Sequence, residues 1–122
     1  MFGNRVEPPW DLRYYEITQL AEPAARSGTL LLQASLAVSK NAPWGHPPPV
    51  IRTVLSDRWG NVLATEDLAP SQWALGEAPA RLAPGQRLDA RLALRRPDRA
   101  LSYTLSACLP DTAGALRCRD DP

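Results

Sequence analysis

The stretch from Pro47 to Trp73 restricts the possible folds more than any other part of the chain. The prolines at 47–49 exclude a helix interior, and they precede an apolar segment at 50–56 with the two-residue period of a strand. Residues 57–61, Asp-Arg-Trp-Gly-Asn, place Asp and Gly where a hairpin loop needs them, and 62–65 return antiparallel. The sequence therefore predicts a β-hairpin inside an all-β domain.

Apolar residues also alternate with polar ones in several other segments. Residues 30–38 form the clearest core strand, and 88–95 and 101–109 repeat the pattern before Pro110 ends the last run. The aromatic and β-branched segment 10–20 is typical of an edge strand. Six or seven short antiparallel strands at intervals of about ten residues predict an immunoglobulin-like β-sandwich.

A chain of 122 residues fits one domain. We expect residues 1–9 to be a linker, 10–118 to form the β-sandwich domain, and 119–122 to be a tail. Residues 70–82 are predicted to be a long loop or short helix whose Trp73, like Trp10, plugs an edge of the core.

Charge and composition exclude several functions. Fourteen basic and 13 acidic residues leave a formal charge of +1, so we expect no nucleic-acid partner. No apolar run reaches the roughly 18 residues of a membrane helix, so membrane attachment would need a segment absent from this chain. Glycine-rich phosphate loops and calcium-loop patterns are absent from the sequence, and we expect no cofactor.

The sequence offers no catalytic constellation. His46 is the only histidine, it lies in Trp-Gly-His-Pro-Pro-Pro, and no Gly-x-Ser-x-Gly motif accompanies it. We therefore interpret His46 as a surface loop residue. The adjacent carboxylates Glu66 and Asp67 would point to opposite faces of a strand, so the sequence predicts that the protein is not an enzyme.

Candidate binding residues are tryptophans and arginines. Trp44, in the proline-rich loop, and Trp59, at the hairpin tip, are either exposed binding anchors or lids folded over the ends of the sandwich. The arginines form a basic strip if their strands are neighbours; otherwise they are the solvated outer faces of the sheets. The candidate binding set is Trp44, His46, Trp59, Arg52, Arg91 and Arg95, with Arg96 and Arg99 extending the arginine series.

The two cysteines, Cys108 and Cys118, lie ten positions apart. This spacing suits a disulfide that closes a short loop, which would indicate an oxidising compartment. The alternative is a pair of free thiols. A zinc site is less favoured, because two cysteines and one distant histidine fall short of four ligands.

Short motifs in a fixed order carry a family resemblance. They are Ala34-Ser35-Leu36, Pro49-x-Ile51-x-x-x-Leu55-x-Asp57-x-x-Gly60, Leu68-x-Pro70, Leu82-x-Pro84-Gly85, and Tyr103-x-Leu105 before Pro110. Over about residues 10–118 the chain resembles the bacterial domain of unknown function 3426, the C-terminal periplasmic domain of proteins that begin with a zinc ribbon and a membrane helix.

The resemblance implies an immunoglobulin-like sandwich on the extracytoplasmic side, with no catalytic residues to transfer. This chain lacks the zinc ribbon and the membrane helix, and either Ser39 or Asn41 takes the place where members often carry an asparagine. Members often end the last strand in Phe-Tyr-Pro. Here Ala107-Cys108-Leu109-Pro110 replaces that ending, and the substitution favours an added disulfide.

These observations favour a non-enzymatic interaction module of the bacterial cell envelope that holds a protein partner through loop tips or a strand edge. We expect it in the periplasm, or anchored to the membrane and facing the periplasm; free cysteines would favour the cytoplasm. The alternative is a β-sandwich that binds a small ligand or glycan through its loop tryptophans and arginines.

Overall fold

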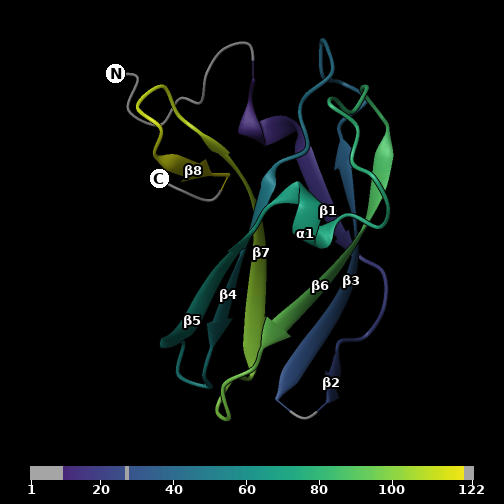
Figure 1. Ribbon diagram of the computed structural model, residues 1–122. Coiled ribbons are helices and arrows are strands. Elements are labelled where there is room, and N and C mark those ends of the chain that lie inside the picture. Colours follow the sequence, from purple (N-terminus) through teal and green to yellow (C-terminus); the bar gives the residue numbers. More distant parts are fainter. Residues whose placement is uncertain (1–9, 27, 120–122) are drawn as a thin grey trace.

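The computed structural model describes residues 10–26 and 28–119, and the fold is all-β (Figure 1). The strands are β1 (Tyr15–Gln19), β2 (Ala24–Arg26), β3 (Thr29–Val38), β4 (Val50–Ser56), β5 (Val62–Leu68), β6 (Arg87–Arg95), β7 (Ser102–Pro110) and β8 (Leu116–Cys118). A short 3₁₀ helix, Leu12–Tyr14, precedes β1, and a single helical turn, α1 (Pro70–Trp73), follows β5.

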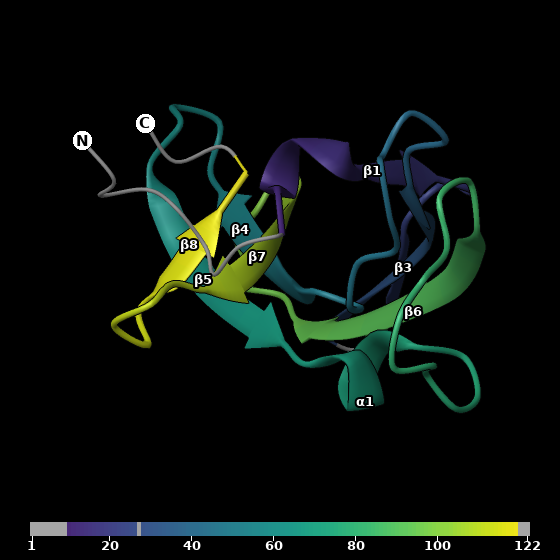
Figure 2. The ribbon, with the colours of Figure 1, turned by 90° about the horizontal axis from the view of Figure 1, so that it is seen from above.

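The strands form two antiparallel sheets. In the first sheet, β3 pairs with β6 along one edge and with β1 and β2 along the other. The second sheet has the order β5-β4-β7-β8. Seen from above, β4, β5, β7 and β8 lie on one side of the molecule and β1, β3 and β6 on the other (Figure 2). The predicted all-β sandwich is confirmed.

The core lies between the sheets and follows the two-residue alternation of the sequence. On β6, Ala90, Leu92 and Leu94 are buried and the residues between them are exposed. In the register of the first sheet, Leu92 lies opposite Leu32, so the two strands present one apolar face. Burying such side chains stabilises the fold by about 1.5–3 kcal/mol each.

The connection after β5 contributes a large residue to the core. Trp73 is fully buried, and its Nε1–H donates to the carbonyl of Pro49 at 3.0 Å. The helical turn that carries Trp73 begins at Pro70, and proline is favoured at the first position of a helix. Trp73 therefore plugs the core as predicted, and partly buried Trp10 packs against the core as well.

Two expectations about strand boundaries are corrected. The first strand begins at Tyr15 and not at Trp10, because the side chain of Asp11 caps the 3₁₀ helix by accepting the Arg13 N–H. Strands β2 and β8 lie in segments where turns dominate the sequence, and each has only three residues. Such short strands form because they pair with longer strands already in place.

Candidate interaction surface

The turn between β4 and β5 is fixed by the buried side chain of Asp57. Its Oδ1 accepts the backbone N–H groups of Trp59 and Asn61, both at 2.9 Å, and its Oδ2 accepts the amide of Asn61 at 3.1 Å. Gly60 adopts φ +83°, a backbone conformation that residues with a side chain rarely adopt. Burial raises the pKa of Asp57, but these hydrogen bonds outweigh it and hold the pKa below its usual value.

This rigid turn presents Trp59 to solvent. The side chain is 71% exposed, and the guanidinium of Arg58 lies 5.2 Å from the centre of its ring. Trp59 is therefore exposed, and the alternative of a lid folded over the end of the sandwich is wrong for this residue. The Asp57 hydrogen bonds order the backbone beneath the indole ring.

A second loop brings an exposed leucine to the same place. The backbone N–H of Leu101 donates to the carbonyl of Ser56 at 2.8 Å, which holds the β6–β7 loop against the end of β4. Leu101 is 68% exposed. It lines one shallow hollow together with Asp57, Arg58, Trp59 and Arg99. We call Arg58, Trp59, Arg99 and Leu101 the hairpin-tip patch.

The hollow is small. Its volume is about 230 Å³, whereas pockets for drug-sized ligands usually measure roughly 300–1,000 Å³. The patch thus combines two exposed apolar side chains with two arginines around a small hollow. Tryptophan and arginine are the residue types that most often dominate protein interfaces.

Sequence reasoning found Trp59 but missed Leu101 as a surface residue. The alternation places Leu101 on the apolar face of the last strand, yet β7 begins one residue later and Leu101 belongs to the preceding turn. The sequence Pro97-Asp98-Arg99, just before Leu101, is typical of a turn and could have indicated that the strand begins after Leu101.

His46 is not a surface residue, so that expectation is wrong. The side chain is fully buried, and its ring lies 5.5–5.7 Å from the rings of Trp10, Tyr14 and Tyr15. Its Nε2 accepts the backbone N–H of Asp11 at 3.1 Å, which assigns the proton to Nδ1, where it is donated to the Trp44 carbonyl at 3.0 Å. Because both ring nitrogens form hydrogen bonds inside the fold, we interpret His46 as a residue that stabilises the structure.

Trp44 and Trp59 do not share a site. Trp44 is 45% exposed and precedes β4, whereas Trp59 follows β4. The two loops therefore lie at opposite ends of the sandwich (Figure 1). A joint binding site for the two tryptophans is excluded by this arrangement.

The candidate arginines are divided between the two sheets. Arg52 lies on β4 and forms a two-pronged ion pair with Asp67, at 2.8 and 3.1 Å. Arg91 and Arg95 lie on the exposed face of β6 in the other sheet. Because β4 and β6 are not neighbours, these arginines form no continuous basic strip.

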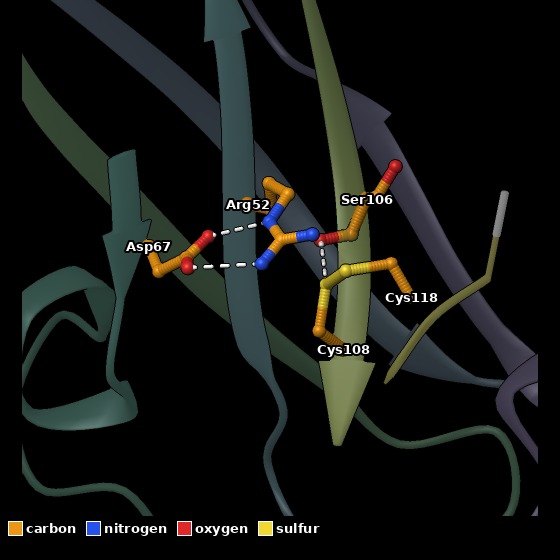
Figure 3. Close-up of a disulfide and its surroundings, with 5 residues drawn as sticks. All are labelled: Arg52, Asp67, Ser106, Cys108 and Cys118. Atoms are coloured by element: carbon orange, nitrogen blue, oxygen red, sulfur yellow. Dashed lines mark hydrogen bonds and ion pairs between the residues drawn. A yellow bond between two sulfur atoms is a disulfide. The ribbon is translucent and has the colours of Figure 1, made fainter. Parts of the chain in front are cut away.

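The two cysteines are joined by a disulfide. Cys108 and Cys118 lie directly opposite each other in the β7–β8 register, with their Cα atoms 4.0 Å apart. Figure 3 shows the guanidinium of Arg52 between the disulfide and Asp67. The disulfide is buried but stands apart from the main core cluster. It therefore fastens the short strand β8 to β7.

Residues 10–26 and 28–119 contain neither a metal-binding cluster nor a membrane-spanning helix. No group of three or more His, Cys, Asp or Glu side chains there is placed to hold a metal ion. In the same ranges, none of the helices has the length and apolar character needed to cross a membrane.

Comparisons with known proteins give a family and a fold. A family model described as "Protein of unknown function (DUF3426)" matches residues 12–107. No curated protein matches the chain. Among solved structures, IrmA from Escherichia coli is similar with a TM-score of 0.50 and 19% identity, over 86% of this chain and 83% of that one. At this identity the likeness concerns the fold alone.

Proposed function

The chain belongs to the DUF3426 family of proteins of unknown function, and we propose that it is a non-enzymatic protein-interaction module of the bacterial cell envelope. The observation that carries the proposal is the exposure of Trp59 on a turn whose backbone is fixed by Asp57. A pre-ordered aromatic anchor binds with little loss of conformational entropy.

The chemistry of the patch indicates the kind of partner. Trp59 and Leu101 offer apolar surface, and Arg58 and Arg99 flank it with positive charge. Such a surface fits a protein segment that presents an apolar side chain beside a carboxylate. Arginine binds a carboxylate through paired hydrogen bonds, which would fix the orientation of the partner.

The disulfide supports the proposed location. Disulfides persist in oxidising compartments and are rare in the cytoplasm. The bond between Cys108 and Cys118 therefore favours the periplasm, either free or attached to the membrane through a segment outside this chain. A cytoplasmic location would require these cysteines to be reduced.

The absence of an enzymatic role remains part of the proposal. The only histidine of the chain is buried with both ring nitrogens engaged, so it is not available as a base at the surface. The alternative, a glycan or small-ligand binder, combined Trp44, Trp59 and the arginines. It loses its support because those residues lie at opposite ends and on different sheets.

In-cell photo-crosslinking tests the proposal. A photoreactive phenylalanine analogue replaces Trp59 in the exported protein, and in a matched variant it replaces Trp44 at the other end. We expect a discrete crosslinked protein from position 59 that is absent from position 44. It should disappear when Arg99→Glu is added to the position-59 variant. Identical crosslinks from both positions, or none from position 59, would contradict the proposal.

A further inference from the structure

Three connections meet at the end of the sandwich that carries the hairpin-tip patch, and we call it the loop end (Figure 1). They join β2 to β3, β4 to β5, and β6 to β7. In the β6–β7 loop, the Arg96 N–H donates to the Gly28 carbonyl at 2.7 Å, and the Leu101 N–H donates to the Ser56 carbonyl at 2.8 Å. Because Gly28 precedes β3 and Ser56 ends β4, this loop bonds the loop ends of the two sheets to each other.

A second hollow opens between the two sheets at the loop end. Ala25 and Leu30 line it from the first sheet, Leu55 lines it from the second, and Arg96 and Leu101 belong to the β6–β7 connection. Its volume is about 210 Å³, whereas an engineered protein cavity of roughly 150 Å³ already holds a benzene molecule. This inter-sheet hollow therefore has room for one apolar side chain.

The inter-sheet hollow adjoins the hollow of the hairpin-tip patch. Leu101 lines both, and it is the residue that the two hollows share. An exposed leucine beside two hollows is a surface that can receive side chains of another protein chain. A convex apolar tip without hollows would instead suit the headgroup layer of a membrane. The shape of the loop end thus favours a protein segment as the occupant.

Arginines dominate the charge of the loop end. The loop-end arginines are Arg26, Arg58, Arg95, Arg96 and Arg99. The acids nearby are Asp98, Glu22, which is close to Tyr103, and Asp57, whose carboxylate is bonded into its own turn. Ion pairs within the described part of the chain involve none of the loop-end arginines. Their guanidinium groups are therefore available to carboxylates of a partner.

We propose that the partner presents an acidic, extended segment, which places one apolar side chain in the inter-sheet hollow and its neighbouring carboxylates on the loop-end arginines. This inference rests on the proposed function, because it specifies the chemistry of the partner at the same end of the sandwich. Guanidinium groups bind carboxylates through paired hydrogen bonds. Clusters of arginine are also a recurring means of recognising acidic motifs.

Fluorescence anisotropy with labelled synthetic peptides tests this chemistry. The probe is Gly-Asp-Glu-Leu-Asp-Glu-Gly, and the matched peptide Gly-Asn-Gln-Leu-Asn-Gln-Gly keeps its shape but removes its charges. We expect the intact, oxidised chain to bind the acidic peptide at least about tenfold more tightly than the amide peptide. Added salt should weaken this binding, since it screens exposed charges. Replacing the leucine of the acidic peptide by serine should weaken it as well, because the inter-sheet hollow then stays empty.

Two alanines of β2 provide a matched pair of variants for the hollow. Both are exposed, but Ala25 lies opposite the buried Leu30 and lines the inter-sheet hollow, whereas Ala24 lies opposite Leu31 on the outer face of the sheet. Ala25→Phe should fill the hollow and weaken binding of the acidic peptide by about tenfold, because the leucine of the peptide loses its place. Ala24→Phe should bind the peptide like the unmodified chain.

Two arginines of β6 provide a matched pair for the charge. Arg95 and Arg91 are both exposed on the outer face of the strand, but Arg95 lies opposite Thr29 at the loop end and Arg91 lies opposite Gln33, farther along the sheet. Arg95→Glu should weaken binding of the acidic peptide much more than Arg91→Glu does. Circular dichroism of every variant verifies that the fold is intact.

Each outcome decides the proposal. Selectivity for the acidic peptide that Ala25→Phe and Arg95→Glu both reduce would support it. Equal binding of the acidic and amide peptides, or binding that survives both variants, would overturn it. If the crosslink from position 59 nevertheless forms, the proposed function stands and the partner is not acidic. Vesicles of phosphatidylglycerol are the second probe. Co-sedimentation with these vesicles in place of peptide binding would assign the loop end to a lipid surface and would also overturn the proposal.

Discussion

The Nε2 atom of His46 accepts the backbone N–H of Asp11, and this bond connects positions 35 residues apart. It closes the end of the sandwich, because the loop before β4 is thereby joined to the segment that leads into β1. The same loop bonds to Leu82 through two backbone hydrogen bonds of 3.0 and 2.7 Å. His46 thus holds three distant segments together.

Replacing this imidazole should destabilise the fold. We expect His46→Ala to lower the free energy of unfolding by about 3 kcal/mol, because it leaves a cavity and removes the partners of the Asp11 N–H and the Trp44 carbonyl. Urea denaturation followed by tryptophan fluorescence measures the change. Glu77→Ala, at an exposed loop residue, is the control and should change stability by less than about 0.5 kcal/mol. A His46→Ala variant as stable as this control would contradict the structural role.

The burial of His46 is a feature that the sequence alone did not predict. Alternation predicts the long strands β3, β4 and β6 well, because each has one face in the core and period two is a local signal. A polar residue in a proline-rich loop carries no such signal. The aromatic rings around His46 come from residues 10–15, and only the tertiary fold brings them there.

The candidate site was predictable in part for the same reason. Trp59 lies in a hairpin turn whose Asp and Gly are visible in the sequence, so its place at a tip follows locally. Leu101 and Arg99 join it only because the β6–β7 loop returns to the same end of the sandwich. Arg52 and Arg91 are separated because their strands belong to different sheets. The alternation of apolar and polar residues along a strand does not indicate which sheet that strand joins.

Truncation to alanine should affect the free energy of unfolding little at Trp59 and strongly at Trp73. Trp59 is mostly exposed, so Trp59→Ala should change the free energy of unfolding by no more than about 0.5 kcal/mol. Trp73 is fully buried and bonded to the Pro49 carbonyl, so Trp73→Ala should lower it by about 3–5 kcal/mol. Parallel urea unfolding curves provide the comparison. A large loss from Trp59→Ala would mean that its ring packs against the fold.

The disulfide should contribute measurably to stability. Removing it in a Cys108→Ala, Cys118→Ala double variant should lower the free energy of unfolding by about 2–3 kcal/mol, as expected for the short loop that it closes. Thermal unfolding with and without reductant separates the bond from the side chains. Reductant should lower the Tm of the unmodified protein and leave the double variant unchanged. If thiol labelling verifies that the disulfide is reduced and the Tm of the unmodified protein nevertheless stays the same, this stabilising role of the disulfide would be contradicted.

Acid should weaken the fold through Asp57. Burial raises the pKa of this carboxyl, but hydrogen bonds from Asn61 and Trp59 outweigh it, so the folded-state pKa lies below the unfolded value of about 3.9. A depressed folded-state pKa stabilises the protein fully above the unfolded pKa. This stabilisation is lost as the pH falls through the folded-state value. The pKa of Asp11, lowered mainly by the Arg13 side chain, and that of Asp111, lowered mainly by the Arg117 side chain, act in the same direction.

The Asp57 contribution can be isolated with Asp57→Asn. The amide keeps an oxygen that can accept the N–H groups of the turn but loses the negative charge. We expect the variant to have a lower Tm than the unmodified protein at neutral pH, and the difference should shrink as the pH falls below about 4, where the carboxyl of the unmodified protein becomes protonated. Scanning calorimetry of both proteins from neutral to acidic pH measures the gap. A gap of constant size would mean that the charge of Asp57 does not stabilise the turn, and that the rigidity of Trp59 depends on hydrogen-bond geometry alone.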